Sequence, residues 1–102
     1  MLEGRPEDCP VRRTVETLSG RWRLLILFHL GAGDMRWGAL RRALVPITPR
    51  VLTATLRGLE ADGLVWRHQR DTVPPEVTYG LTARGAALAP VFAAMGAWGS
   101  EG

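Results

Sequence analysis

The stretch ALVPITPRVLTATL, residues 43–56, decides the fold because it carries Pro46 and Pro49 within a run that otherwise reads as helix. A proline inside a helix removes a backbone hydrogen bond and collides with the preceding turn, so two prolines this close indicate a break. Thr48 is a preferred N-cap residue, and the first helical position after the cap tolerates proline. The sequence therefore predicts a tight turn at Pro46 and a new helix that starts at Pro49.

A short amphipathic helix is predicted before this turn, over residues 37–44. Trp37, Leu40 and Leu44 recur at i, i+3 and i+7 and therefore share one face. Arg42 lies on the far side of the helical wheel, so we expect its guanidinium to be exposed.

The helix after the turn is predicted to have two different faces. An apolar stripe runs from Val51 to Leu59, and Gly63 suits the left-handed conformation that often ends a helix. At about 100° per residue, the side opposite this stripe forms a narrow basic ridge. The ridge consists of Arg50, Thr53, Ala54 and Arg57.

Two further helices are predicted nearer the N-terminus. Residues 10–18 place Val11, Val15 and Leu18 on one face at helical spacing. The apolar run RWRLLILFHL, residues 21–30, is long enough for a helix and predicts one that is packed on several sides.

Two short β-strands are predicted downstream, separated by the proline-stiffened loop DTVPPE. Two helices joined by a tight turn and followed by a hairpin describe a winged helix-turn-helix, a mostly α fold with a small β-hairpin (α+β). We expect one domain over residues 9–99, with the helix-turn-helix at about 37–62, the wing at about 64–81 with strands at 64–70 and 77–81, and a C-terminal helix at about 82–98.

Positive charge is concentrated in the middle of the chain. Residues 36–70 contain seven arginines against two acidic residues, a distribution typical of nucleic-acid binding. The second helix of a helix-turn-helix enters a major groove roughly 12 Å wide, where arginine can donate to both O6 and N7 of guanine. The alternative is that these arginines form an ordinary solvated surface.

Three groups of DNA contacts are predicted. Residues near the start of the second helix would reach base edges or adjacent phosphates, neighbouring residues would hold the phosphate backbone, and the hairpin would approach the flanking groove. The first group, at base edges or adjacent phosphates, is Arg50 and Thr53 with Pro49 and Ala54 beside them. The second group, at the phosphate backbone, is Arg57, Arg42 and Thr48. The third group, on the hairpin, is Arg70 and Thr72.

Short motifs throughout the chain carry a family resemblance. They are Cys9-Pro10-Val11, Gly20-Arg21-Trp22, Leu52-Thr53, Leu59-Glu60, Asp62-Gly63-Leu64, and Pro74-Pro75 with Tyr79, Leu81 and Thr82. In these motifs the chain resembles the HxlR-type winged helix-turn-helix transcriptional regulators, from about Cys9 to Trp98. The resemblance implies a homodimeric bacterial regulator that binds operator DNA and dimerises through its N- and C-terminal helices.

The chain departs from this family at three positions. The family often has long polar side chains where this chain has Ala54 and Gly58, and a basic residue where it has Glu76. Ala54 shortens the surface that would read bases, and Gly58 is expected to cost roughly 1 kcal/mol of helix stability relative to alanine. Glu76 would repel phosphate if it pointed at the DNA backbone. The operator sequence therefore does not transfer from the family.

The last helical segment is expected to need a partner. Residues 85–98 have no charged or hydrogen-bonding side chain except the Trp98 indole, although a surface helix normally has a polar face. Pro90 is expected to kink or split the segment. A two-fold partner would present two recognition helices to an inverted repeat with half-sites about 34–36 Å apart, or a multiple of this. The predicted dimer contacts are Val11, Val15, Leu88, Val91, Phe92, Met95 and Trp98.

The single cysteine, Cys9, is a candidate redox-sensing thiol. It precedes Pro10 at a predicted helix N-terminus, with Arg12 and Arg13 a turn away, and both features favour the thiolate. The family resemblance adds that some relatives sense oxidants or electrophiles through an N-terminal cysteine. The alternative is a thiol that only packs against the domain or caps the helix.

Several other classes of protein are not expected. One cysteine and two histidines show no metal-ligand spacing, and no nucleophile, base and orienting acid can be assembled, so we expect no metal, no cofactor and no enzyme. There is no signal-peptide pattern and no apolar run near the roughly 20 residues of a membrane span. We expect a cytoplasmic protein with no membrane association, and a flexible segment at residues 1–8.

The expected partners are double-stranded DNA and a second copy of the chain, with the small-molecule effector unknown. One alternative is a winged-helix protein-interaction module that does not bind DNA. Another is a small enzyme built around Cys9 and a histidine. DNA binding through phosphates would weaken steeply with salt, whereas an apolar protein contact would respond little.

Overall fold

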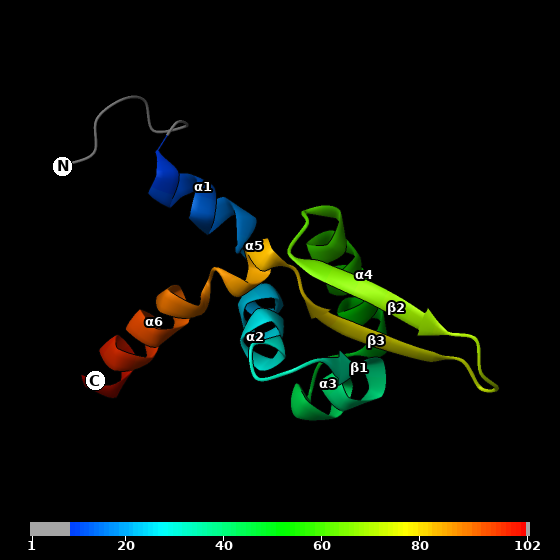
Figure 1. The fold of residues 1–102 in the computed structure, drawn as a ribbon. Coiled ribbons are helices and arrows are strands. Elements are labelled where there is room, and N and C mark those ends of the chain that lie inside the picture. The colour runs from blue at the N-terminus through cyan, green and yellow to red at the C-terminus, as the bar shows by residue number, and fades with distance from the viewer. Residues whose placement is uncertain (1–8, 102) are drawn as a thin grey trace.

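The fold is an elongated winged-helix domain with terminal helices at one end and the wing at the other (Figure 1). The computed structural model describes residues 9–101, so the flexible segment predicted at 1–8 lies outside the described residues. The elements in chain order are α1 (Pro10–Thr17), α2 (Arg21–Leu30), β1 (Met35–Arg36), α3 (Trp37–Ala43), α4 (Pro49–Ala61), β2 (Val65–Arg70), β3 (Glu76–Leu81), α5 (Ala83–Ala86) and α6 (Ala89–Glu101).

The predicted helix-turn-helix is formed by α3 and α4. The helix before the turn ends at Ala43 and the next one starts at Pro49, which confirms the break predicted at Pro46. Ile47 anchors the turn because its side chain is buried and its amide donates to the carbonyl of Leu44 at 2.9 Å. The two helices are therefore held close together, and the start of α4 is fixed relative to the core.

The sheet has three antiparallel strands in the order β1-β3-β2, one more than predicted. The wing hairpin is formed by β2 and β3, with Arg70 opposite Glu76 beside the loop. The added strand, β1, contributes only Met35 and Arg36 on the other side of β3. Two residues are too few to show the alternation that identifies a strand in sequence, which is why β1 was missed.

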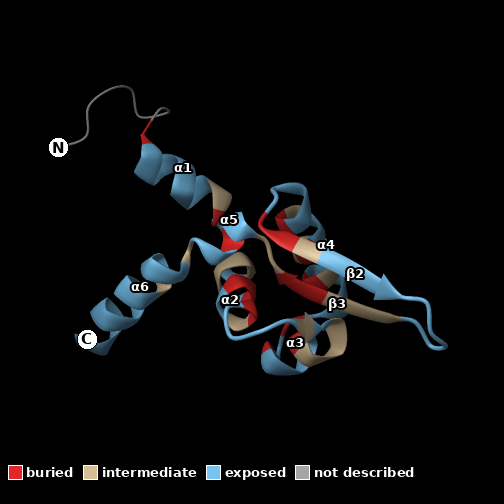
Figure 2. Ribbon diagram, viewed as in Figure 1, coloured by how far each residue is buried: buried red, intermediate tan, exposed pale blue. Residues whose placement is uncertain are grey.

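The core lies between α2, α3, α4 and the adjoining ends of β2 and β3. Figure 2 shows buried residues concentrated there, whereas α1 and α6 are exposed along most of their length. The buried core residues are Leu18, Ile26, Leu27, Leu30, Leu40, Leu44, Ile47, Leu52, Leu56, Leu59, Leu64, Val65 and Tyr79.

The central helix α2 is packed on several sides and open on one. Ile26, Leu27 and Leu30 are buried, but Leu25 and Phe28 are 40% and 57% exposed. The prediction of packing on several sides is confirmed, because α2 contacts α4 and β3 and the ring of Phe28 meets that of Phe92 on α6. A continuous apolar run does not show which remaining side lacks a covering element.

The predicted C-terminal helix is divided into α5 and α6. Thr82 caps α5 by accepting a hydrogen bond from the amide of Gly85 at 3.2 Å, and α6 starts at Ala89. A Cβ at Gly85 would collide with the carbonyl of Leu64, so α5 can lie this close to the start of β2 only with glycine there. The split predicted near Pro90 is confirmed, and α6 then leads away from the body of the domain (Figure 1).

Candidate nucleic-acid interface

The start of α4 is defined by a side-chain cap. Thr48 has extended backbone angles, and its Oγ1 accepts a hydrogen bond from the amide of Val51 at 3.2 Å. Pro49 occupies the first turn, where its missing amide proton costs nothing. The cap predicted from the sequence is therefore confirmed. The positive end of the helix dipole lies beside the exposed Thr48 hydroxyl, an arrangement favourable to an anion.

The two faces of α4 differ as predicted. Leu52, Leu56 and Leu59 are buried against the domain, whereas Arg50 and Arg57 are exposed two turns apart. Within residues 9–101, no carboxylate lies within ion-pair distance of either guanidinium. Ala54 is also exposed and lies between them on the helix surface. The outward side of α4 therefore presents two guanidinium groups with only a small side chain between them.

Thr53 is braced by the preceding helix. Its Oγ1 accepts a hydrogen bond from the indole Nε1 of Trp37, the first residue of α3, at 3.2 Å. The side chain is half-buried, and the hydroxyl proton is not used in this bond. Thr53 can therefore still donate to an acceptor at the surface, from a position that α3 holds in place.

Arg42 lies on α3 and is exposed, as the helical wheel predicts. It is the penultimate residue of α3, directly before the turn that leads to Thr48. The structure thus places Arg42 on the element that precedes α4.

The wing carries a cluster of two arginines around one carboxylate. Glu76 lies within 3.1 Å of Arg36 on β1 and 3.8 Å of Arg70 on β2. At the loop, the hydroxyl of Thr72 donates to the carbonyl of Pro74 at 2.8 Å. Glu76 therefore does not present an isolated negative charge, because both neighbouring strands supply a guanidinium to it.

Arg67 is a further candidate DNA contact that was not among those predicted from the sequence. It lines a hollow of about 480 Å³ together with Arg57, Thr53 and Trp37, between α4 and the sheet. Its Nη2 donates to Oε1 of Gln69 at 2.9 Å. Strand parity could have identified it, since Arg67 lies on the same face of β2 as the buried Val65 and therefore faces α4 rather than away from it.

The N-terminal cysteine is enclosed. Cys9 occupies the N-cap position of α1, but its side chain makes no capping hydrogen bond, and the residue is only 7% exposed. Of the two alternatives for a non-sensing thiol, packing agrees with this burial and capping does not.

The predicted dimer contacts fall into two groups. Leu88 and Phe92 pack back on the domain, and the ring of Phe92 meets that of Phe28 edge-on at a centroid distance of 5.7 Å. The others remain exposed on α1 and α6, and the exposed side of α2 adds two residues that were not predicted. The exposed apolar surface consists of Val11, Val15, Leu25, Phe28, Val91, Met95 and Trp98.

Residues 9–101 contain neither a cluster of metal-ligating side chains nor a membrane-spanning helix. No three His, Cys, Asp or Glu side chains gather there in a way that could hold a metal ion. No helix in the described part of the chain is both long and apolar enough to cross a bilayer.

Known proteins are similar to this chain along most of its length. The profile of the HxlR-like helix-turn-helix family matches residues 17–102. YybR of Bacillus subtilis (strain 168), an uncharacterized HTH-type transcriptional regulator, is 42% identical over 95 residues, which cover 93% of this chain and 76% of YybR.

Solved structures are similar to this chain over most of its length as well. A MarR-family transcriptional regulator from Porphyromonas gingivalis W83 has a TM-score of 0.92 at 34% identity, over 98% of both chains. The redox regulator HypR in its oxidized form has a TM-score of 0.84 at 40% identity, over 92% of this chain and 97% of HypR. The similarity therefore extends over the helix-turn-helix, the wing and the terminal helices.

Proposed function

Because the chain belongs to the HxlR-like helix-turn-helix family of transcriptional regulators, we propose that it binds inverted-repeat operator DNA as a homodimer. The observation that carries this proposal is the outward side of α4, where Arg50 and Arg57 are exposed without acidic partners in the described residues. We propose no catalytic activity, and DNA binding would place the protein in the cytoplasm.

In the proposed complex, α4 enters the major groove. Arg50 and Thr53 contact base edges or adjacent phosphates near the start of the helix, where Pro49 and Ala54 allow close approach. Thr48, Arg42 and Arg57 hold the phosphate backbone and set the register. The buried stripe of α4 supports this arrangement because it fixes which side of the helix faces outward.

The wing is proposed to contact the flanking groove through Arg70 and Thr72. Glu76 weakens this contact, since it already holds Arg70 and Arg36 by ion pairs. Arg67 supplies a second basic side chain near Arg57, in the hollow between α4 and the sheet, whose lining also includes Glu60. The wing therefore contributes more to affinity than to sequence preference.

The second subunit is proposed to cover the exposed apolar surface of α1, α2 and α6. Large apolar side chains left exposed on three helices are typical of a surface that another protein covers. Two-fold pairing through these helices leaves α4 and the wing of both subunits free, because they lie at the other end of the domain (Figure 1).

We also propose that oxidation of the Cys9 thiol regulates operator binding. It is supported by the similarity to HypR, a redox regulator, and by the position of Cys9 at the start of α1. Oxidation of a buried thiol there would disturb the packing of α1 and hence the dimer. Hydrogen peroxide, which oxidises a single thiol to the sulfenic acid and is itself reduced to water, would lower the operator affinity of the wild type but not of Cys9→Ser; equal responses would remove the thiol from the proposal.

The experiment that tests the function is selection of bound sequences from random duplex DNA with the purified chain. We expect an inverted repeat with half-sites about 34–36 Å apart or a multiple of this. Affinity for the selected site would fall log-linearly with salt, with a slope of about −0.9 for each phosphate contacted. Failure to enrich any sequence at low salt would favour the protein-interaction module instead.

A matched pair of variants locates the contact. Arg50→Ala would lower affinity and relax sequence preference at one position per half-site. Arg21→Ala removes the same charge from α2, where Arg21 is exposed and lies over the Trp22 ring at 4.5 Å. Equal binding by both variants would contradict the assignment of α4.

A further inference from the structure

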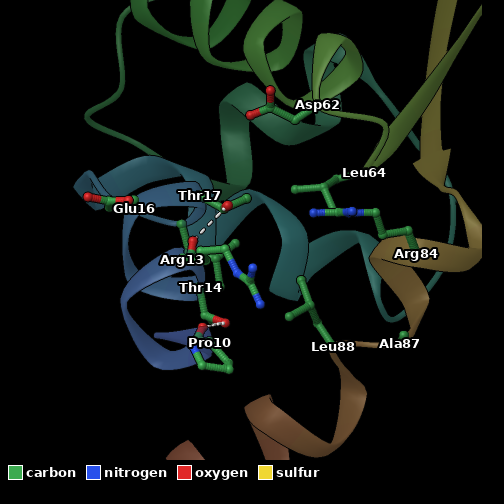
Figure 3. A pocket seen from close by; sticks show the side chains of 11 residues that line it. Pro10, Arg13, Thr14, Glu16, Thr17, Asp62, Leu64, Arg84, Ala87 and Leu88 are labelled. Carbon is green, nitrogen blue, oxygen red and sulfur yellow. Dashed lines mark hydrogen bonds between the residues drawn. The ribbon is translucent and has the colours of Figure 1, made fainter. Parts of the chain in front are cut away.

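A pocket of about 800 Å³ lies on the side of the domain away from the proposed DNA surface. It is bounded by α1, by the end of α4 and the residues that follow it, and by α5 (Figure 3). Its volume falls in the range of sites that bind small organic molecules. None of the residues proposed to contact DNA lines it.

Two arginines supply the charge of this pocket. The guanidinium groups of Arg13, on α1, and Arg84, on α5, extend into it from different walls (Figure 3). Within residues 9–101, neither guanidinium has a carboxylate within ion-pair distance. Both groups are therefore available to an anion from solution.

The acidic residues of the lining do not cancel this charge. Glu16 is paired with Arg12 at 3.3 Å, and Asp62 is paired with Arg23 at 2.6 Å. Neither Arg12 nor Arg23 lines the pocket. Each lining carboxylate is thus neutralised from outside, and the pocket keeps a net positive charge.

The neutral part of the lining is largely apolar. Leu18 and Leu64 are buried beneath the pocket, and Leu88 forms part of its wall. The hydroxyl groups of Thr14 and Thr17 donate to the carbonyls of Pro10 and Arg13, at 3.0 and 2.8 Å, which leaves the arginines as the strong donors (Figure 3).

We propose that this pocket binds a small organic carboxylate with an apolar body. The carboxylate would accept hydrogen bonds from Arg13 and Arg84, since a guanidinium matches a carboxylate with two parallel donors. The apolar body would lie against Leu18, Leu64 and Leu88. A ligand held in this way draws α1 toward α5, next to Asp62 at the end of α4.

The test is calorimetric titration of the 102-residue chain, without DNA, so that its outcome does not depend on the proposed DNA binding. The probe is 2-naphthoate, and we expect a Kd of about 1 mM or tighter for a ligand of this size. 2-Naphthalenemethanol keeps the rings without the charge and would bind at least about tenfold more weakly. Inorganic phosphate supplies charge without an apolar body and would also bind more weakly.

Variants identify the pocket as the site. Arg13→Gln and Arg84→Gln would each weaken 2-naphthoate binding at least about tenfold. Both side chains are exposed, so the replacements leave the core intact. Arg21→Gln removes the same charge outside the lining and would leave the Kd within about twofold, because exposed charges are screened.

Three results would overturn the proposal: no heat of binding, equal binding by the Arg13→Gln/Arg84→Gln double variant, or phosphate binding as tightly as 2-naphthoate. Residues 1–8 carry Glu3, Glu7 and Asp8, which could supply a carboxylate in place of a free ligand. The titration is therefore repeated with a chain that begins at Cys9. If only the shortened chain bound 2-naphthoate, the proposal would also be overturned. That result would mean that residues 1–8, and not a free ligand, occupy the pocket.

Discussion

Arg23 and Asp62 form an ion pair with 2.6 Å between Nη1 and Oδ2, although they lie 39 positions apart in the sequence. The same Nη1 donates to the carbonyl of Thr17 at 2.9 Å. Thr17 ends α1 and Asp62 is the C-cap of α4, so one side chain on α2 joins the end of a terminal helix to the end of the recognition helix. The ends of α1 and α4 are therefore bound to the same guanidinium.

Replacing Arg23 with alanine would lower the free energy of unfolding by about 1–2 kcal/mol. Hydrogen bonds to charged groups contribute about 1.5–3 kcal/mol, and this figure is reduced here because Asp62 is half-exposed and regains water. Urea denaturation followed by circular dichroism measures the change. Arg41→Ala is the control, since Arg41 is exposed and has no ion-pair partner within residues 9–101, and its expected change is within about 0.5 kcal/mol; equal effects of the two substitutions would show that the bridge adds no stability.

The same bridge explains the glycine at position 58. A Cβ there would lie 2.6 Å from Nη2 of Arg23, so Gly58 leaves the space through which the guanidinium reaches Asp62. Gly58→Ala in an Arg23→Ala chain would gain about 1 kcal/mol from helix propensity, whereas in the wild type the displaced guanidinium would cancel most of this gain. A double-mutant cycle by urea denaturation measures the difference, and additive effects would contradict the steric explanation.

Local sequence signals predicted the elements of the fold well. The pair Thr48-Pro49 located the start of α4, and Gly63 adopts the predicted left-handed conformation with φ of +75°. Such signals act through bonds and hydrogen bonds between near neighbours, so one chain is enough to read them. The helical wheel likewise identified Arg50 and Arg57 as exposed.

Contacts between distant residues could not be read in the same way. Sequence reasoning treated Gly58 as a cost and Glu76 as a source of repulsion. The structure gives each of them a partner on another element, Arg23 for Gly58 and Arg36 with Arg70 for Glu76. Their roles depend on which elements pack together, and periodicity within one segment carries no such information.

Removing the charge of Glu76 would strengthen DNA binding. Glu76→Gln releases Arg36 and Arg70 from their ion pairs, which makes both available to phosphate. We expect tighter binding to all duplexes, and a slope of log K against log salt that steepens by about 1–2. Fluorescence anisotropy across a salt series measures both quantities.

The control for Glu76 is Glu101→Gln, which makes the same change in net charge at the end of α6. We expect it to leave the salt slope unchanged. If the two variants behaved alike, net charge rather than the wing cluster would be responsible.

The hydrogen bond from Trp37 to Thr53 is expected to affect sequence preference as well as stability. Trp37→Phe removes the indole donor, so Thr53 loses the bond that orients it. We expect a loss of about 0.5–1.5 kcal/mol in the free energy of unfolding and weaker discrimination between operator variants. Thr53→Val would do the same, and the double variant would add little, because both changes remove one bond.

Thr53→Ser is the matched control, since it keeps the hydroxyl. Operator affinities are compared over a panel of single-base variants of the selected site. Full discrimination by Trp37→Phe would mean that Thr53 does not need α3 to present its hydroxyl.

The apolar surface of α6 gives the last prediction. Trp98 is 77% exposed in the single chain, so Trp98→Asp removes little internal packing but places a charge in the proposed dimer contact. We expect a folded monomer by sedimentation, with unchanged circular dichroism and much weaker binding to the full inverted repeat, because a monomer contacts only one half-site. Ser100→Asp adds the same charge at an exposed polar position of α6 and would leave the dimer intact. A wild-type chain that sediments as a monomer at micromolar concentration would contradict the proposal directly, and a Trp98→Asp chain that remains dimeric would assign the contact to another surface.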